Sequence, residues 1–153
     1  MINWKSKIIK AVDKNPPSKD NLSKEPGSKS DFDLIEKPSD RFDPLNLKPA
    51  SVVVGITEDD IPKLFLTKRS DQLEQHSGQI AFPGGKVEIG ESFTEAAIRE
   101  AEEEVGLEKK DFEICGYLDT YETGTGYRIL PVVVFIKSNF IPRIDINEVA
   151  ETF

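Results

Sequence analysis

Residues 85–107, which read GKVEIGESFTEAAIREAEEEVGL, decide how this sequence folds. The second half of the stretch is predicted to be a helix. Ser92 and Glu95 have the S-x-x-E spacing of a capping box, and Gly106 is a natural C-terminal stop. Small and branched apolar residues recur between them at helical spacing, so one side of the helix can pack on a sheet.

Three glutamates of this helix, Glu100, Glu103 and Glu104, share one face, because positions i, i+3 and i+4 lie together at roughly 100° per residue. Their charges repel each other, and two of them lie near the C-terminal end, where the helix dipole disfavours negative charge. Glutamate-rich helices are more often solvated faces. A divalent cation such as Mg²⁺, which takes carboxylate ligands, is the alternative that explains this placement.

The composition narrows the classes of function. The chain has 153 residues, one cysteine, one histidine and a net charge of −8. A single domain fits this length, an intrachain disulfide is excluded, and a zinc site with several histidines is excluded. Residues 50–153 hold twenty acidic and ten basic side chains, so we expect no binding to nucleic acid or to an anionic membrane. The expected location is the cytoplasm.

The charge and the turn residues divide the chain in two. Residues 1–49 are predicted to be a polar, partly disordered tail with a short amphipathic helix at its start. Residues 50–153 are predicted to be the folded domain. Strands are expected near 51–56, 63–68, 79–82, 111–121 and 128–137, with Val132–Ile136 in a central strand. Strands around one long helix indicate an α+β or three-layer fold.

The order of residues 85–107 resembles the motif of the Nudix hydrolases, G-x5-E-x7-R-E-U-x-E-E-x-G-U with U an apolar residue. Every fixed position is filled, so the match is highly specific. The resemblance implies an α/β/α sandwich around a mixed sheet, and hydrolysis of a diphosphate with Mg²⁺ or Mn²⁺. It implies metal ligands at Glu100, Glu104 and the Gly85 carbonyl, with Glu103 as a third glutamate ligand or as the holder of a metal-bound water. Arg99 would orient the glutamates and Glu91 would brace the loop. The general base stays open among Glu103, Glu122, Glu148 and Glu151.

The residues before that motif resemble the coenzyme A diphosphatase branch of the same family. Residues 66–70, 76–79 and 82–85 carry the likeness, and residues 116–127 and 148–151 fit it. The resemblance implies cleavage of coenzyme A or a derivative to 3′,5′-ADP and 4′-phosphopantetheine. Tyr121 and Tyr127 are candidates for stacking on adenine, and a place in the core is the alternative for either. Glu74 departs from the branch, which usually has a basic residue there. The predicted substrate-binding residues are Arg69, Lys68, His76, Gly78, Gln79 and Tyr127.

Other interpretations remain. The alternatives are a Nudix diphosphatase for ADP-ribose or another nucleotide derivative, and an inactive Nudix-fold fragment or binding module. The sequence stops at residues 151–153, within a segment that continues in the family, so the C-terminal strand and helix are expected to be truncated. That interpretation predicts that Val132–Ile136 lack a cover. Many family members form homodimers, which makes a dimer a further expectation.

Overall fold

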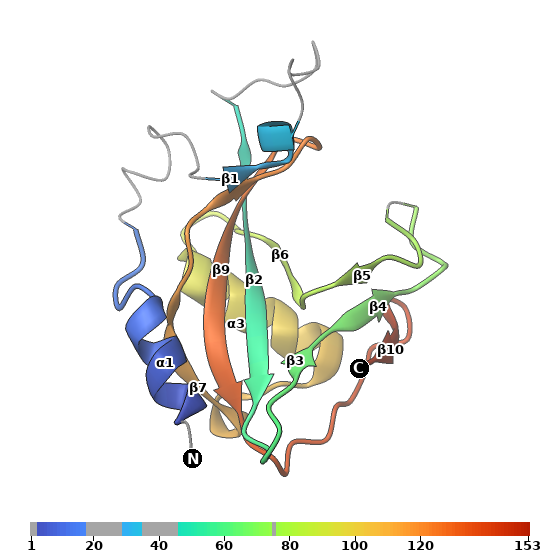
Figure 1. Cartoon of the computed structure of the whole chain (residues 1–153). Coiled ribbons are helices and arrows are strands. Elements are labelled where there is room, and N and C mark those ends of the chain that lie inside the picture. The colour runs from blue at the N-terminus through green and yellow to red at the C-terminus, as the bar shows by residue number, and fades with distance from the viewer. Residues whose placement is uncertain (1–2, 18–28, 35–45, 75) are drawn as a thin grey trace.

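The computed structural model describes residues 3–17, 29–34, 46–74 and 76–153. Two helices and ten strands form a three-layer arrangement in this part of the chain (Figure 1). The elements are α1 (Trp4–Ala11), β1 (Lys29–Ser30), η1 (Asp31–Leu34), β2 (Lys48–Thr57), β3 (Leu64–Phe65), β4 (Thr67–Arg69), β5 (Ile80–Ala81), β6 (Gly84–Lys86), α3 (Phe93–Val105), η2 (Lys109–Asp111), β7 (Phe112–Tyr117), β8 (Tyr121–Glu122), β9 (Tyr127–Ile136) and β10 (Val149–Thr152).

The centre of the fold is a parallel pair of long strands, β2 and β9, in register from Lys48 opposite Tyr127 to Thr57 opposite Ile136. Antiparallel strands join them on both sides: β3 and β6 pair with β2, and β7 and β8 pair with β9. The main sheet is therefore mixed. A smaller sheet in the order β10-β4-β5 lies beside it, and brings the C-terminal strand next to β4 (Figure 1). The α+β fold with a mixed sheet is confirmed.

The core lies between this sheet and α3. Alternate residues of β9, namely Leu130, Val132, Val134 and Ile136, are buried against the helix, as the period of two in a strand requires. On the helix side the buried residues are mostly small: Ala96, Ala97, Ala101 and Val105. Small side chains let the helix axis lie close to the sheet, so the glutamates on its flank stay near the strand ends.

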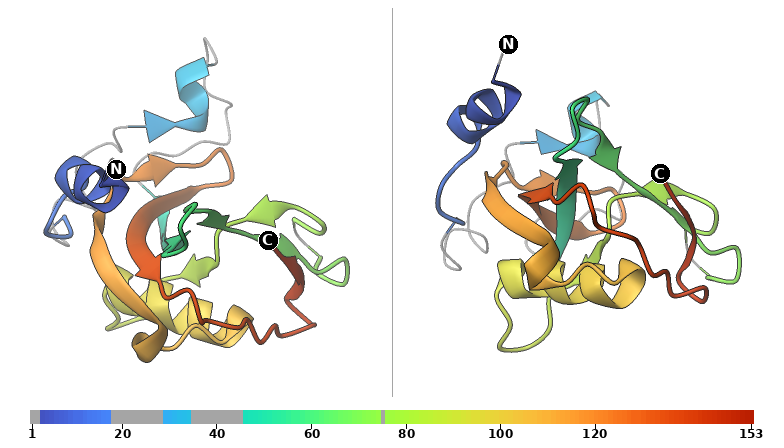
Figure 2. Two further views of the ribbon diagram at one scale, coloured as in Figure 1. Left: turned by 60° about the horizontal axis from the view of Figure 1, so that its bottom comes forward. Right: turned by 90° about the horizontal axis from the view of Figure 1, so that it is seen from below.

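The opposite face of the sheet is partly covered by α1, which confirms the predicted N-terminal amphipathic helix. The Trp4 ring contacts the Phe135 ring edge-on, with 5.5 Å between centroids, and Lys5 forms an ion pair with Glu58. Seen from below, the sheet lies between α3 and α1 (Figure 2, right).

Two expectations need correction. All five residues of Val132–Ile136 are buried, so the prediction that they lack a cover is wrong: α3 covers one set of side chains, and Trp4 contacts Phe135 on the other face. The predicted strand at 63–68 is interrupted at Leu66. Its first part, β3, pairs with β2, whereas β4 turns into the smaller sheet.

Of the tail predicted to be partly disordered, residues 1–49, the structure describes 3–17, 29–34 and 46–49; the other residues of the tail lie outside the described ranges. Within the described ranges, no helix is both long and apolar enough to span a membrane.

Candidate functional site

The helix α3 begins and ends where its capping residues predict. The Ser92 side chain accepts a hydrogen bond from the Glu95 backbone N–H, and the Glu95 carboxylate accepts one from the Ser92 N–H, so the capping box is complete. Gly106 closes the helix in the left-handed conformation, with φ of 70°. These caps fix the rotation of the helix, and Glu100 and Glu104 follow one another by a single turn on the flank that faces β6.

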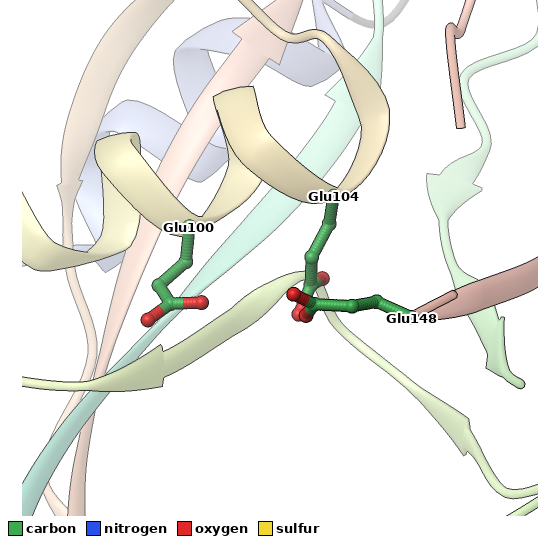
Figure 3. A group of neighbouring side chains, drawn as sticks. All are labelled: Glu100, Glu104 and Glu148. Atoms are coloured by element: carbon green, nitrogen blue, oxygen red, sulfur yellow. The ribbon is translucent and has the colours of Figure 1, made fainter. Parts of the chain in front are cut away.

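Three carboxylates gather at this flank. One oxygen of each of Glu100, Glu104 and Glu148 lies within 4.8 Å of the others. Figure 3 shows the first two side chains descending from α3 and the third reaching across from the turn before β10. The structure thus brings together Glu100 and Glu104, as the helical spacing predicts, and adds a residue from the far end of the chain.

Backbone hydrogen bonds place Glu148. Its N–H donates to the Asp145 carbonyl (3.0 Å), and the Asp145 N–H donates to the Glu104 carbonyl at the end of α3 (3.0 Å). The Glu148 carbonyl accepts from Ser70 N–H (2.8 Å), at the end of β4. The turn that carries Glu148 is therefore tied both to the helix of the other two glutamates and to the strand of Arg69.

The cluster concentrates negative charge in a place where water is scarce. Only 3% of the surface of Glu104 is exposed, and burial, followed by the charges of Glu100 and Glu148, raises its pKa to about 8. Arg69 and the Gly84 backbone oppose this rise. Burial also raises the pKa of Glu100, although Arg99 acts against it. Of the three carboxylates, Arg99 forms an ion pair with Glu100 alone, and among the described residues no basic side chain forms an ion pair with Glu104 or Glu148. An oxygen-ligated divalent cation would supply the further positive charge.

Arg99 holds the loop and the helix together beside the cluster. Its guanidinium donates two hydrogen bonds to Glu91 (2.8 and 3.1 Å), one to Glu100 (2.9 Å), one to Glu103 (3.3 Å) and one to the Lys86 carbonyl (3.1 Å). The bonds from Arg99 lower the pKa of Glu91. Arg99 and Glu91 therefore form an ion pair next to Glu100 and outside the cluster, at the positions where the sequence analysis expected them to brace the loop and the helix.

Glu103, predicted as a third metal ligand, does not join the cluster of described carboxylates. Its side chain is 56% exposed and pairs with Arg99. Around a helix, Glu104 lies about 40° from Glu100, whereas Glu103 lies about 60° away in the other direction. Glu148 occupies the third position. The sequence singled it out only as one of four general-base candidates.

Gly85 lies directly beneath the cluster. A Cβ atom at this position would overlap the Glu100 carboxyl carbon and both its oxygens. Glycine at this position therefore permits the close approach of β6 to the glutamate. This contact places the Gly85 backbone at the cluster, where the resemblance expects its carbonyl.

A pocket of about 420 Å³, lined by apolar residues and by several polar side chains, opens on the other side of β6. Its lining includes Arg69, His76 and Gln79 together with Gly84 and Gly85. Across from them, the turn after β8 and the start of β9 contribute Thr123, Thr125 and Tyr127. We call this space the polar pocket.

Arg69 and His76, which line the polar pocket, have unusual local environments. The Arg69 Nε is buried and has no hydrogen-bond partner among the described residues. His76 adopts a positive φ of 57°, and its Nδ1 lies 3.1 Å from the Gln79 Oε1. Gly78, with φ of 69°, donates its N–H to the Arg69 carbonyl (3.1 Å).

The Lys68 side chain lies on the face of β4 opposite to that of Arg69. Neighbouring residues of a strand point to opposite faces, and Lys68 does not line the polar pocket, whereas Arg69 does. Of the predicted substrate-binding residues, the pocket therefore gathers Arg69, His76, Gln79 and Tyr127.

An apolar hollow of about 640 Å³ adjoins the polar pocket and shares Val52, Ala81, Phe82 and Ile129 with it. Tyr121 lines this hollow rather than the polar pocket. Of the remaining general-base candidates, Glu122 is buried in an ion pair with Arg128 (2.7 Å), and Glu151 is exposed on β10.

Known proteins are similar to this chain in sequence and in fold. A NUDIX domain matches residues 46–149. The chain is 40% identical over 125 residues to an uncharacterized Nudix hydrolase NudL from Shigella flexneri serotype 5b (strain 8401). The aligned region covers 81% of this chain and 65% of that protein. A NudL from Escherichia coli (strain SMS-3-5 / SECEC) is 39% identical with the same coverage. The chain thus spans about 65% of the length of these curated relatives.

Solved structures agree on the fold. A Caenorhabditis elegans Ap4A hydrolase binary complex has a TM-score of 0.60 at 20% identity, covering 68% of this chain and 76% of that chain. The Nudix hydrolase RenU from M. smegmatis has a TM-score of 0.58 at 19% identity, covering 69% of this chain and 68% of that chain. The solved structures agree with the fold, and the domain match over residues 46–149 shows that this chain belongs to the Nudix family.

Proposed function

We propose that this chain is a metal-dependent diphosphatase that cleaves coenzyme A or its derivatives to 3′,5′-ADP and 4′-phosphopantetheine. The observation that carries the proposal is the convergence of Glu100, Glu104 and Glu148 within 4.8 Å. An all-oxygen donor set of this kind fits Mg²⁺ or Mn²⁺. Such an ion, when bound, holds diphosphate oxygens and lowers the pKa of the attacking water.

The chain's own residues would supply position and charge. Glu100, Glu104 and Glu148 would hold the ion, while Arg99 keeps the first of them in place through its 2.9 Å bond. Diphosphate cleavage depends mainly on positioning and on neutralising charge on the oxygens. Arg69 lines the polar pocket, and its charge lowers the pKa of Glu104 in the cluster, so its guanidinium would offer positive charge to a phosphate group there.

The preference for coenzyme A rests on the likeness of residues 66–85 to the coenzyme A branch, and on the part of that segment that lines the polar pocket. Arg69, His76, Gln79 and Phe82 come from it. Glu74, the residue that departs from the branch, is exposed. Glu74 also does not line the polar pocket, unlike His76 and Gln79, and this favours an exposed exchange over a lost phosphate contact.

A four-substrate assay tests the proposal. Coenzyme A, ADP-ribose, NADH and ATP are compared with the wild-type chain in Mg²⁺, and we expect kcat/KM for coenzyme A to exceed the others at least about tenfold. Preference for ADP-ribose or another nucleotide by the same factor would overturn the coenzyme A assignment and leave the diphosphatase assignment standing.

The matched variants are Glu104→Gln in the cluster and Glu102→Gln on the exposed side of the same helix. Loss of one preorganised charged group in the site is expected to lower turnover by about a hundredfold or more, so Glu104→Gln should be nearly inactive while Glu102→Gln keeps wild-type turnover. Near-normal turnover in Glu104→Gln would overturn the metal assignment.

A further inference from the structure

The hairpin formed by β8, the following turn and the start of β9 makes one wall of both cavities. Thr123, Thr125 and Tyr127 face the polar pocket, and Tyr121 faces the apolar hollow. The opposite wall carries Arg69, His76 and Gln79. The width of the polar pocket therefore depends on the position of this hairpin relative to the opposite wall.

Internal bonds give the hairpin its shape. The Thr123 N–H donates to the Tyr127 carbonyl (2.8 Å), the Gly126 N–H donates to the Thr123 carbonyl (3.0 Å), and the buried pair of Glu122 and Arg128 joins the two strands. These contacts all lie within the hairpin. The outer edge of β8 is therefore available to pair with another segment.

That segment comes from the N-terminal part of the chain, before the matched domain. The short strand β1 pairs in parallel with β8, with Lys29 opposite Tyr121. Directly after it, the Asp31 carboxylate accepts two hydrogen bonds from the hairpin: Oδ1 from the Tyr121 hydroxyl (2.6 Å) and Oδ2 from the Gly124 N–H (2.7 Å). In Figure 1, β1 and the turn after it lie against the end of the β8–β9 hairpin.

We propose that Asp31 is a positioning residue that fixes the hairpin wall of the polar pocket, so that its contact with the hairpin shapes the substrate site. The proposal rests on the proposed function, since it takes the polar pocket as the substrate site. A carboxylate that bridges two donors on one turn holds both in place, and hydrogen bonds to a charged acceptor are about twice as strong as neutral ones. The acidic cluster is built on α3 and on the turn before β10, so Asp31 acts on substrate binding and leaves the chemical step unchanged.

Asp31 and Asp33 provide a matched pair of variants. Both lie in η1, and the Asp33 carboxylate accepts from the Ser30 N–H (2.9 Å) within its own turn. Asp31→Asn and Asp33→Asn remove the same charge from the same turn, but only the first removes an acceptor from the hairpin. Asp31→Ala removes both acceptors.

Steady-state kinetics on the best substrate of the four-compound panel test the inference. In Asp31→Ala we expect KM to rise about five- to tenfold with kcat within about twofold of wild type, in Asp31→Asn a smaller rise, and in Asp33→Asn no change. A purely structural role would lower the melting temperature and leave KM alone.

Two measurements report the contact without relying on turnover. Amide exchange at Gly124 should be faster in Asp31→Ala than in wild type or Asp33→Asn, because its N–H loses its acceptor. The hydrogen bond to Asp31 is also the main cause that raises the pKa of Tyr121, so one tyrosine should ionise at lower pH in Asp31→Ala.

The outcomes separate the two proposals. Unchanged KM in Asp31→Ala, or an equal change in Asp33→Asn, would overturn the inference while the diphosphatase stands. A wild-type chain that hydrolyses none of the four compounds would overturn both. Altered exchange at Gly124 together with unchanged KM would show a contact that supports the fold only, and would also overturn the inference.

Discussion

At the scale of single residues, Gly85 and Glu100 show how a backbone position serves the acidic cluster. The strand β6 approaches α3 so closely that a methyl group at Gly85 would occupy the space of the Glu100 carboxylate. The sequence motif has glycine here, and the structure gives the physical reason: the neighbour is the end of a side chain that must stay in one place.

Gly85→Ala is therefore expected to move the Glu100 carboxylate out of the cluster. Because the obstructing atoms are the flexible end of a side chain, the free energy of unfolding should change by less than about 1 kcal/mol. The affinity for Mn²⁺ should fall about tenfold or more. Calorimetric titration with Mn²⁺ and urea unfolding measure the two quantities, and unchanged Mn²⁺ affinity would contradict the placement of Glu100.

Glu104 also predicts how stability depends on pH when no metal is present. Its pKa rises from 4.5 in the unfolded chain to about 8 in the folded protein, so the folded state retains a proton that the unfolded chain has released. This contribution to stability is fully present below about pH 4.5 and is lost as the pH rises toward 8. Each unit of pKa shift corresponds to about 1.4 kcal/mol.

In EDTA, the free energy of unfolding of the wild-type chain should thus decline between about pH 5 and pH 8, while Glu104→Gln declines less, because it carries no titrating group at that position. Saturating Mg²⁺ should offset the decline in wild type. Urea unfolding at several pH values measures this. An equally steep decline in wild type and in Glu104→Gln would argue against a strained, metal-free carboxylate.

At the scale of elements, α3 illustrates what local sequence determines. Its capping box, its glycine stop and its apolar stripe are all short-range signals, and the helix Phe93–Val105 follows from them. The strands β2 and β9 follow equally from their branched apolar runs. The break at Leu66, by contrast, depends on the pairing of β4 with β10, which comes from the end of the chain. No local sequence pattern predicts that pairing.

Removal of the cap tests the same element. Ser92→Ala deletes the side chain that accepts from the Glu95 N–H, and the expected loss is about 1 kcal/mol of unfolding free energy. With Mg²⁺ bound, turnover should stay near wild type, since the glutamates lie two turns further along the helix. A loss below about 0.3 kcal/mol, judged against Glu102→Gln as the surface control, would mean that the cap contributes little.

At the scale of the whole molecule, the candidate site is assembled from distant parts of the chain. The sequence identified Glu100 and Glu104 because they share a helix face, and it identified Arg69, His76 and Gln79 through the likeness of their segment to the coenzyme A branch. It placed Glu103 in the cluster by helical spacing, since nothing local shows that the turn before β10 delivers Glu148 instead. The contact of Asp31 with Tyr121 spans 90 residues, a separation over which composition and periodicity carry no information.

The architecture also explains why the acids can lie so close together. α3 is bound to the sheet by its small apolar face, and the turn at Asp145 and Glu148 is bound to the end of the same helix. Packing energy therefore holds three carboxylates together against their mutual repulsion. A divalent cation would turn this electrostatic cost into a binding contribution.

The most direct test is the anomalous diffraction of a crystal soaked in Mn²⁺. We expect a peak within about 2.5 Å of carboxylate oxygens from Glu100, Glu104 and Glu148. The peak should be absent from a Glu104→Gln crystal that is treated in the same way. A peak at some other group of residues, or no peak at the cluster with Mn²⁺ in excess, would contradict the claim that these three glutamates form the metal site.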